Sequence, residues 1–316
     1  MNRMKQVPLL IVTHNPAQNL EHHLDMLYKQ FSQIILVDNG SSLETRNCIA
    51  EQVRHRGSAL ETILNDENLG VATALNQGFS LAIEQGSDFL ITQDQDSIPE
   101  PGMKDALVNG LENHPNRENL AILAPVVFEE VTNQATRYLR QKHKFLIERL
   151  YCDQQFLRNV TFVITSGSLY NLNLYRVLGP FLDNFFIDAV DTEYCLRAIR
   201  SGYEVSVVCG TRLRHTLGNR QRKSILGQIH YPTFHSPTRW YYISRNRVSM
   251  LRRYAWRFPH WFFFEMAVTL TGLTRMLLFE DQRLKKIKAF LLGTRDGLTG
   301  KMGRISIETQ KLLKSS

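Results

Sequence analysis

The sequence lacks the cysteine patterns and the leader segment that mark several protein classes. Its four cysteines (Cys48, Cys152, Cys195 and Cys209) form no Cys-x-x-Cys pair and no ladder of spacings. This usage is typical of reduced structural residues in a cytosolic protein. The first apolar run, Val7 to Val12, is too short for a signal-peptide core, and no small-residue cleavage site follows it. We therefore expect the chain to stay in the cytoplasm.

Glycine is missing where two common nucleotide-binding folds need it. The turn after the first apolar run is Thr13-His14-Asn15-Pro16. A Rossmann domain needs Gly-x-Gly-x-x-Gly in that turn, so that backbone amides can approach a pyrophosphate. A phosphate loop with Gly-Lys-Ser/Thr is also absent. A nicotinamide-dependent enzyme and a P-loop NTPase are thereby disfavoured.

Acidic residues are scarce in the C-terminal third. Residues 212–316 hold 21 Lys and Arg against 5 Asp and Glu, a net charge of +16, whereas residues 1–211 hold 17 against 25, a net of −8. Such asymmetry indicates a basic end that meets an anionic partner, which could be phospholipid, a phosphorylated substrate or nucleic acid. The alternative is a solvated basic face without a partner.

Short apolar runs alternate with helical patterns through the first two thirds of the chain. The expected strands are Val7–Val12, Ile34–Val37, Glu61–Leu64, Phe89–Ile91, Leu120–Phe128, Val160–Ile164 and Tyr203–Val208. Continuous apolar strands separated by helices indicate an α/β fold with a mostly parallel sheet covered on both faces. Residues 129–158 are polar without a clear period, and the sequence permits a mobile loop there.

Two carboxylates follow the fourth of these strands. Asp94 and Asp96 come directly after the apolar run Phe89–Ile91. Side chains at i and i+2 of an extended segment point the same way, roughly 7 Å apart. Hard oxygen ligands at this spacing suit a divalent cation that also bridges nucleotide phosphates, and open α/β sheets bind ligands at the carboxyl ends of their strands. The alternative is a polar turn.

A second acidic cluster precedes a later helix. Asp188, Asp191 and Glu193 lie within six residues, just before a helix that ends near Ser201-Gly202. A carboxylate at a helix start is often only a cap, and we expect one of the three to have that role. His215 lies beyond the next strand.

Several short segments together resemble a known enzyme family. They are Val12-Thr-His-Asn15, Val37-Asp-Asn-Gly-Ser41, Asn68-Leu-Gly-Val-Ala72 with Asn76-Gln-Gly78, Asp94-Gln-Asp-Ser97, Phe186-Ile-Asp-Ala-Val-Asp-Thr-Glu-Tyr-Cys-Leu-Arg197, His215 and Arg239-Trp-Tyr-Tyr-Ile-Ser-Arg-Asn246. In this order the set resembles the family 2 glycosyltransferases of the GT-A fold. The forms at residues 94–97 and 239–246 resemble those of bacterial rhamnosyltransferases that build cell-surface polysaccharides, including lipopolysaccharide O-antigen.

The resemblance implies a donor site and a metal site. The residues expected to contact the sugar nucleotide are Thr13, Asn15, Asp38, Asn68, Gly70, Asp94 and Gln95. Asp96 would bind the metal directly, Asp94 would reach the ribose or a metal-bound water, and His215 would help to hold the metal or the diphosphate. Oxygen ligands and a diphosphate favour Mg²⁺ or Mn²⁺. For His215 the alternative is a surface histidine beside Arg212 and Arg214.

The same resemblance implies an inverting mechanism with one carboxylate as general base. Asp191 occupies the family's catalytic position, although the family often has Glu-Asp where this chain has Val190-Asp191. Asp188 is the second choice, and Glu193 is expected on the helix face or against the acceptor. A dTDP-β-L-rhamnose donor would give an α-L-rhamnoside. UDP-galactofuranose or a UDP-hexose is the alternative donor.

An apolar segment in the basic third suggests a membrane surface. Residues 261–279 could just span a bilayer, but Glu265 and Arg275 inside the segment would be costly there. With cations on both flanks, we expect this segment to lie in an anionic membrane surface. The alternatives are packing on the catalytic core or on a second subunit, which would make a homo-oligomer.

We expect three parts of the chain. Residues 1–100 would bind the nucleotide sugar, residues 101–218 would bind the acceptor and carry the base, and residues 219–316 would form a basic helical region. By family analogy the acceptor is a saccharide on undecaprenyl diphosphate at the inner face of the cytoplasmic membrane. A competing interpretation is a nucleic-acid-binding protein that uses the basic third with stacking aromatics, namely Trp240, Tyr241, Tyr242, Trp256 and Trp261. The enzyme interpretation expects no nucleic acid partner.

Overall fold

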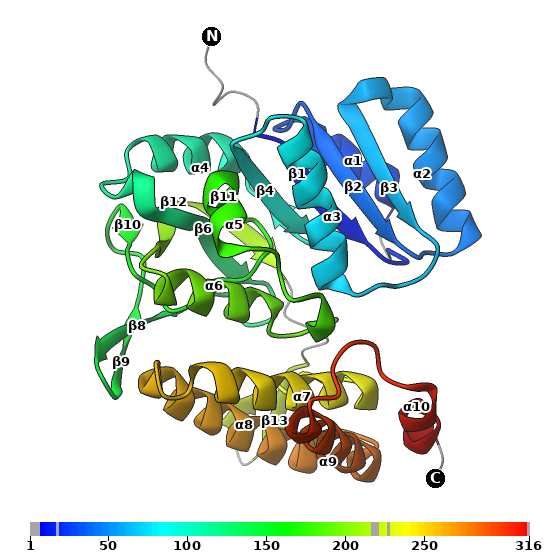
Figure 1. Ribbon diagram of the computed structural model, residues 1–316, viewed down its shortest axis with the longest axis vertical. Coiled ribbons are helices and arrows are strands. Elements are labelled where there is room, and N and C mark those ends of the chain that lie inside the picture. The colour runs from blue at the N-terminus through cyan, green and yellow to red at the C-terminus, as the bar shows by residue number, and fades with distance from the viewer. Residues whose placement is uncertain (1–6, 17–18, 216–220, 226–227, 315–316) are drawn as a thin grey trace.

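The computed structural model describes residues 7–16, 19–215, 221–225 and 228–314. Within these residues one large sheet is flanked by helices (Figure 1). Its main path runs in the order β10 (Phe156–Leu157), β12 (Glu204–His215), β6 (Leu120–Glu129), β11 (Leu169–Asn171), β4 (Phe89–Asp94), β1 (Leu9–Thr13), β2 (Ile34–Asn39) and β3 (Leu60–Asn65). Two short strands pair beside this path: β5 (Ile98–Pro99) with β12, and β7 (Gln134–Ala135) with β6.

The direction of the strands decides where their ends meet. The pairs β4–β1, β1–β2, β2–β3 and β6–β12 are parallel. Strand β11 is antiparallel to both β4 and β6, so these two neighbours run the same way. The carboxyl ends of β1, β2, β4 and β12 therefore share one edge of the sheet. The predicted α/β class with a mostly parallel sheet is confirmed.

The centre of the sheet is buried on both faces because strands such as β1 and β2 are apolar over most of their length. Leu10, Ile35 and Val37 pack in one core with α3 (Val71–Glu84), α5 (Leu172–Leu178) and α6 (Val190–Arg200). Leu9 and Ile11 point to the opposite face, since successive side chains of a strand alternate. There they pack in a second core with α1 (Leu20–Tyr28), α2 (Leu43–Arg56) and α4 (Met103–Glu112).

The predicted strand at Val160–Ile164 is wrong. Its backbone amides bond to two different strands. The Val160 amide donates to the Val205 carbonyl of β12, and the Thr161 amide donates to the Leu139 carbonyl in the hairpin described below. The segment crosses from the sheet to a neighbouring hairpin. The strand that enters the sheet here is β11, a few residues later, and its three residues are too few to give a sequence signal.

Part of the segment expected as a loop is a β-hairpin. Strands β8 (Tyr138–His143) and β9 (Leu146–Leu150) pair with each other, outside the main sheet. Much of this hairpin is exposed, which is why its residues are polar and show no apolar period. It projects from the sheet toward the C-terminal helices (Figure 1).

Two of the four cysteines are joined, which contradicts the expectation that all are reduced. Cys152 and Cys209 form a disulfide, while Cys48 and Cys195 are free. Pairing of β10 with β12 brings the two residues together across 57 positions of sequence, a separation that no spacing rule detects. The bond lies against a cavity between α4 and the β10–β12 edge.

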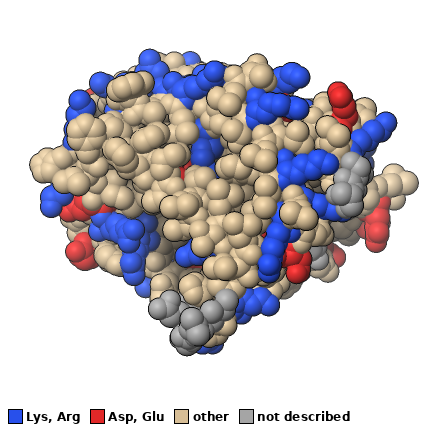
Figure 2. Space-filling model, turned by 90° about the horizontal axis from the view of Figure 1, so that it is seen from below, with Lys and Arg blue, Asp and Glu red and all other residues tan. Residues whose placement is uncertain are grey.

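The C-terminal third forms a helical layer beneath the sheet (Figure 1). Its elements are β13 (Lys223–Ile225), β14 (Gln228–His230), α7 (Pro237–Tyr254), α8 (Pro259–Phe279), α9 (Arg283–Thr299) and α10 (Ile307–Lys314). Helices α7 and α9 pack closely, because Gly293 and Gly297 of α9 lie against the backbone of α7. Seen from below, this layer shows many Lys and Arg side chains and fewer acidic ones on a largely uncharged surface (Figure 2).

The aromatic residues of this layer are not available for base stacking. Trp240, Tyr241, Tyr242 and Trp261 are all less than 5% exposed. Of the five aromatic residues expected to stack on bases, Trp256 alone, at 95% exposure, lies at the surface. The nucleic-acid interpretation depended on these aromatics as stacking surfaces, so the structure removes its main support.

Candidate active site

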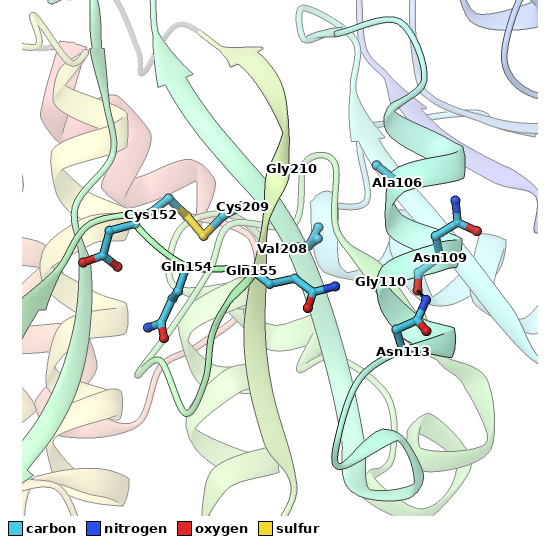
Figure 3. A pocket seen from close by; sticks show the side chains of 11 residues that line it. Ala106, Asn109, Gly110, Asn113, Cys152, Gln154, Gln155, Val208, Cys209 and Gly210 are labelled. Atoms are coloured by element: carbon cyan, nitrogen blue, oxygen red, sulfur yellow. Dashed lines mark hydrogen bonds between the residues drawn. A yellow bond between two sulfur atoms is a disulfide. The ribbon is translucent and has the colours of Figure 1, made fainter.

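Two cavities of about 470 Å³ lie at different places on the sheet. One lies between α4 and the Cys152–Cys209 disulfide (Figure 3), and Asp153 is its only carboxylate. The other lies at the carboxyl ends of β1, β2, β4 and β12. Besides His14, four carboxylates and one imidazole line it, namely Asp94, Asp96, Asp188, Asp191 and His215. Volume does not separate the two cavities, whereas the convergence of ionisable groups selects the second.

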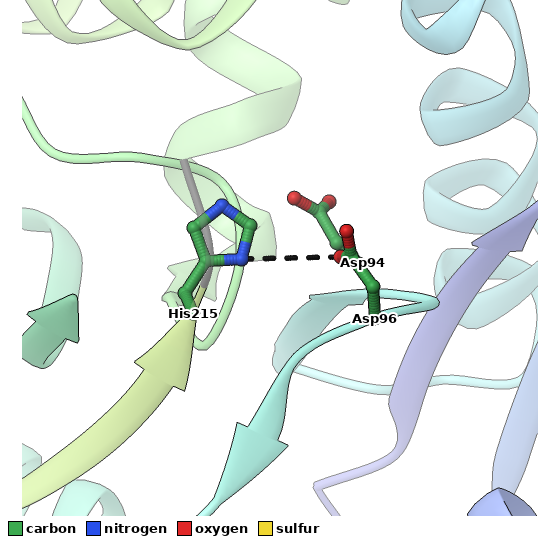
Figure 4. Close-up of side chains that lie close together, drawn as sticks. All are labelled: Asp94, Asp96 and His215. Carbon is green, nitrogen blue, oxygen red and sulfur yellow. Dashed lines mark ion pairs between the residues drawn. The ribbon is translucent and has the colours of Figure 1, made fainter. Parts of the chain in front are cut away.

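The paired aspartates and the histidine meet at this edge. Asp94 ends β4, Asp96 follows in the turn, and His215 ends β12 on the opposite side of the cavity (Figure 4). One ligand atom of each lies within 4.8 Å of those of the other two. Opposite ligands of a bound Mg²⁺ are roughly 4.2 Å apart. The three side chains therefore have the chemistry and the spacing to hold one divalent cation after a small closure.

Two serine hydroxyls, hydrogen-bonded in series, orient the ring of His215. Nδ1 of His215 lies 2.8 Å from Oγ of Ser97, and Oγ of Ser166 donates to Ser97 at 2.8 Å. His215 is only 8% exposed, so it is not the surface histidine of the alternative interpretation. Supporting hydrogen bonds of this kind fix the ring of a metal-binding histidine.

Burial changes the acidity of Asp94. The loss of solvent raises the pKa of its carboxyl to about 6, His215 partly opposes that rise, and the charges of Asp96 and Asp191 add to it. A cation at the cluster would favour the ionised carboxylate, because metal ligands bind in their deprotonated form.

The expected nucleotide residues lie partly on the cavity wall and partly behind it. Thr13, Asn68, Gly70, Asp94 and Gln95 line the cavity. Gln95 also accepts a hydrogen bond from the His14 amide at 2.8 Å, which ties the ends of β1 and β4 together.

Asn15 and Asp38 lie behind the cavity wall and hold the turn after β2 in place. Asp38 is fully buried and accepts hydrogen bonds from Thr13 Oγ1 and from the Ser41 amide. Asn15 accepts from the Ser42 amide at 2.8 Å. These contacts shape the turn after β2, and neither side chain lines the cavity. Direct nucleotide contact by Asn15 and Asp38 stays a prediction.

Residues 186–189 form a strained segment of the cavity wall, between the residues expected to bind the nucleotide and Asp191. Phe186, Asp188 and Ala189 all have positive φ, between 61° and 67°. Non-glycine residues rarely adopt this conformation, and where they do so the surrounding structure must hold them. The amide of Asn246 provides that hold, because its Nδ2 donates to the carbonyls of Phe185, Ile187 and Asp188 at 2.7–2.9 Å.

Gly70 meets this segment directly. Its φ is 90°, and a Cβ there would come within 2.7 Å of the Phe186 carbonyl oxygen. The next amide, Val71, donates to that same oxygen at 2.7 Å. Only glycine permits this approach, which joins the nucleotide side of the cavity to the acidic cluster.

The three acids of the cluster have different surroundings. Asp191 lines the cavity, and its Oδ1 accepts from the Thr192 amide at 2.7 Å. Burial raises the pKa of Asp191, and no cation is paired with it among the described residues. Asp188 lines the cavity too, but Arg239 binds its Oδ1 at 3.0 Å. Of the two, Asp191 is the carboxylate that is free to accept a proton.

Glu193 lies on the face of α6 that packs against α7, which is one of its two expected positions. It is 2% exposed, and it binds Arg197 at 2.8 Å and the Tyr254 hydroxyl at 2.7 Å. Its carboxylate thus joins α6 to α7, and contact with the acceptor stays a prediction. The helix cap expected among the three acids is absent, because α6 begins after Ala189 with no side-chain cap.

Sequence reasoning gave no role to several residues of the site. Asn39 lines the cavity, accepts from the Leu69 amide and donates to Asn68. Arg239 lines it while binding Asp188, and Ser97 orients His215. All three lie inside the segments that resemble the family, so the sequence pointed to these positions. It did not show which side chains they contact.

Two solved structures of similar fold place this fold among known ones. S. aureus TarS 1-349 in complex with UDP-GlcNAc matches with a TM-score of 0.55 at 16% identity, over 93% of this chain and 81% of that one. GalNAc-T7 with UDP, GalNAc and Mn²⁺ matches with a TM-score of 0.57 at 14% identity, over 78% of this chain. This chain spans less than half of the GalNAc-T7 chain, namely 47%. The likeness shows a GT-A-type fold.

The sequence comparisons narrow this class to one family. The model of glycosyl transferase family 2 matches residues 9–179, and the chain belongs to that family. It is also 28% identical over 299 residues to the dTDP-rhamnosyl transferase RfbF of Shigella flexneri. That alignment covers 93% of this chain and 96% of the relative.

Proposed function

We propose that this glycosyltransferase transfers L-rhamnose from dTDP-β-L-rhamnose, with inversion, to a lipid-linked saccharide used in a cell-surface polysaccharide such as O-antigen. The observation that carries the proposal is similarity to a dTDP-rhamnosyl transferase along nearly the whole chain. The Asp94–Asp96–His215 cluster supports it, because a nucleoside diphosphate leaving group needs charge stabilisation. In this proposal residues 1–100 bind the donor, and residues 101–218 bind the acceptor and carry the base.

Asp94, Asp96 and His215 would hold Mg²⁺ or Mn²⁺ in this reaction. When bound, the cation would neutralise the charge of the departing diphosphate. Thr13, Asn68 and Gly70 would position the nucleotide on the other side of the cavity. Asp191 would take the proton from the acceptor hydroxyl as that oxygen attacks the anomeric carbon.

The test of the donor is calorimetric titration with dTDP-rhamnose, UDP-galactose, UDP-galactofuranose and GDP-mannose, each with and without Mg²⁺ or Mn²⁺. We expect dTDP-rhamnose to bind at least ten times more tightly than the UDP- and GDP-sugars, and only with metal. Preference for a UDP-sugar would keep the fold and mechanism but remove rhamnose. Absence of any nucleotide binding would contradict the enzyme proposal.

The proposal places the enzyme at the inner face of the cytoplasmic membrane, with residues 219–316 toward the lipid. Within the described residues α8 is the one helix long and apolar enough to cross a bilayer, with a mean hydropathy of 1.4. Only 6% of that window is buried, although Trp261 and Met276 of α8 pack in the two neighbouring apolar clusters. Most of the helix therefore has a surface free for a bilayer. Exposed leucines and one phenylalanine recur at intervals of seven along α8 and α9: Phe263, Leu270, Leu277, Leu284, Leu291 and Leu298.

The charges near these exposed apolar side chains favour an anionic surface as the partner of α8. Arg275 and Arg283 are exposed near it, as are Arg252 and Arg253 at the end of α7. Lys286, which follows the apolar segment in the sequence, is not among these exposed cations, because it is buried in a 2.7 Å ion pair with Glu280. Apolar side chains among exposed cations fit a helix lying in an anionic bilayer surface.

Vesicle co-sedimentation tests this placement. The wild type should sediment with vesicles of phosphatidylcholine and phosphatidylglycerol, and much less with phosphatidylcholine alone. Leu270→Glu with Leu277→Glu should reduce the bound fraction at least fivefold, because both side chains are exposed on α8. The control is Val177→Glu on α5, where the side chain is as exposed as that of Leu270. Unchanged vesicle binding, or loss of a dimer in size-exclusion chromatography instead, would contradict the membrane placement.

A further inference from the structure

A smaller cavity lies where α6, α7 and α8 meet. It encloses about 250 Å³, and Asp188 and Ala189 belong both to its wall and to that of the larger cavity. The other residues around it are Thr192, Ile243, Arg247, Met250, Trp261 and Glu265. The two spaces therefore adjoin at the strained segment beside Asp191. None of the proposed donor or metal residues lies on the wall of the smaller cavity.

The wall carries buried polar atoms without partners. Oδ2 of Asp188, Nη1 of Arg247 and Nε1 of Trp261 find no hydrogen bond within the described part of the chain. An unpaired buried polar group costs about 1–3 kcal/mol, and a charged group costs more. Native proteins therefore keep few of them, and three around one cavity call for a common partner. One acceptor and two donors suit a ligand whose hydroxyls both donate and accept.

The charges of the wall disfavour a phosphate as that partner. Nε of Arg247 lies 3.1 Å from Oε2 of Glu265, so the guanidinium is already paired with a carboxylate. Asp188 adds a second carboxylate. Arg239 is paired with Asp188 at 3.0 Å, so each of the two carboxylates already has its own cation. No unpaired positive charge is left for an anion, and a neutral polyhydroxylated group fits instead. This pairing also explains why an acidic residue lies within the apolar helix α8.

The position of the cavity suits the acceptor side of the reaction. Thr192 lines it, and both the amide and Oγ1 of Thr192 donate to Oδ1 of Asp191, at 2.7 and 3.3 Å. A group seated there would have its hydroxyl close to the proposed base. The volume equals that of roughly eight water molecules, which is enough for one sugar ring. Trp261 and Met250 supply an apolar surface for its carbon face.

We propose that this cavity binds the terminal monosaccharide of the acceptor, with Arg247, Asp188 and the Trp261 indole N–H as its hydrogen-bond partners. This inference rests on the proposed function, since it assigns the acceptor subsite of the same reaction. The cavity also lies between the proposed base, Asp191, and the C-terminal helices that the proposed function places at the membrane. The acceptor sugar would lie between the start of α6, which carries Asp191 and Thr192, and α8, which the proposed function places toward the membrane.

The test is saturation-transfer NMR on the full chain with dTDP and Mg²⁺ present. The probes are the methyl glycosides of L-rhamnose, D-galactose, D-glucose and N-acetyl-D-glucosamine. We expect at least one to bind the wild type, and to bind Trp261→Phe and Arg247→Met at least fivefold more weakly. Trp261→Phe removes the N–H and keeps an aromatic surface. The matched control is Arg253→Met, because Arg253 is exposed on the same helix α7 outside the cavity.

The readouts separate this inference from the proposed function. If Arg247→Met leaves Glu265 unpaired and fails to fold, the double variant Arg247→Met with Glu265→Met replaces it. The affinity for dTDP, measured in parallel by calorimetry, should not change in any of these variants. Failure of every glycoside to bind the wild type, or equal binding to Trp261→Phe, would overturn the subsite. Failure of dTDP to bind the wild type would instead overturn the donor assignment.

Discussion

Asp96→Ala is expected to abolish metal-supported donor binding while the protein stays folded. Asp96 is exposed at the cavity and lies 3.9 Å from Nδ1 of His215, so its removal takes one oxygen from the three-residue cluster. We expect dTDP-rhamnose affinity in Mg²⁺ to fall on the order of 100-fold, which equals about 2.7 kcal/mol. Calorimetric titration with and without metal measures this change.

The control for this variant is Asp105→Ala. Asp105 is an exposed carboxylate in the first turn of α4, and it does not line the site cavity. Its removal changes the net charge by the same amount and should leave donor affinity within a factor of two. If Asp96→Ala binds donor as the wild type does, with the same dependence on metal, the metal-binding role of Asp96 is wrong.

Asp191→Asn is expected to lower turnover on the order of a thousandfold while donor binding persists. The amide has the size of the carboxylate and can still accept from the Thr192 amide, so the start of α6 should be preserved. What is lost is the oxygen that accepts the proton. Rhamnosyl transfer in single-turnover experiments, with donor affinity measured alongside, tests this expectation.

Asp188→Asn is the matched comparison, because Asp188 lines the same cavity but is bound by Arg239. We expect a much smaller loss of turnover in this variant. Near-normal transfer by Asp191→Asn, combined with a large loss in Asp188→Asn, would move the base to Asp188.

The pH profile gives an independent check on Asp191. Burial raises the pKa of this carboxyl above its ordinary value, and a general base works only when deprotonated. Turnover should therefore fall as the pH is lowered through that raised pKa, at a higher pH than an exposed aspartate would give. A rate that stays level down to the pKa of an ordinary aspartate would contradict the assignment.

Much of the fold could be predicted because the signals are local. Apolar runs such as Ile34–Val37 and Leu120–Phe128 are strands in the structure, since a strand covered on both faces must be apolar at each position. The prediction of strands failed where a strand is very short or where paired strands lie exposed outside the main sheet. Strand β11 has three residues, and the hairpin of β8 and β9 lies outside the main sheet.

The sequence by itself determined the family, the parallel sheet and the positions of Asp94, Asp96, Asp191 and His215, because motif order and strand periodicity are properties of the chain alone. Tertiary structure alone decided which side chains share a surface. It separated Asp191 from Asp188 through Arg239, placed Glu193 in a buried ion pair with Arg197, and joined Cys152 to Cys209. Each of these depends on a contact between distant segments or on a helix orientation, and packing sets both.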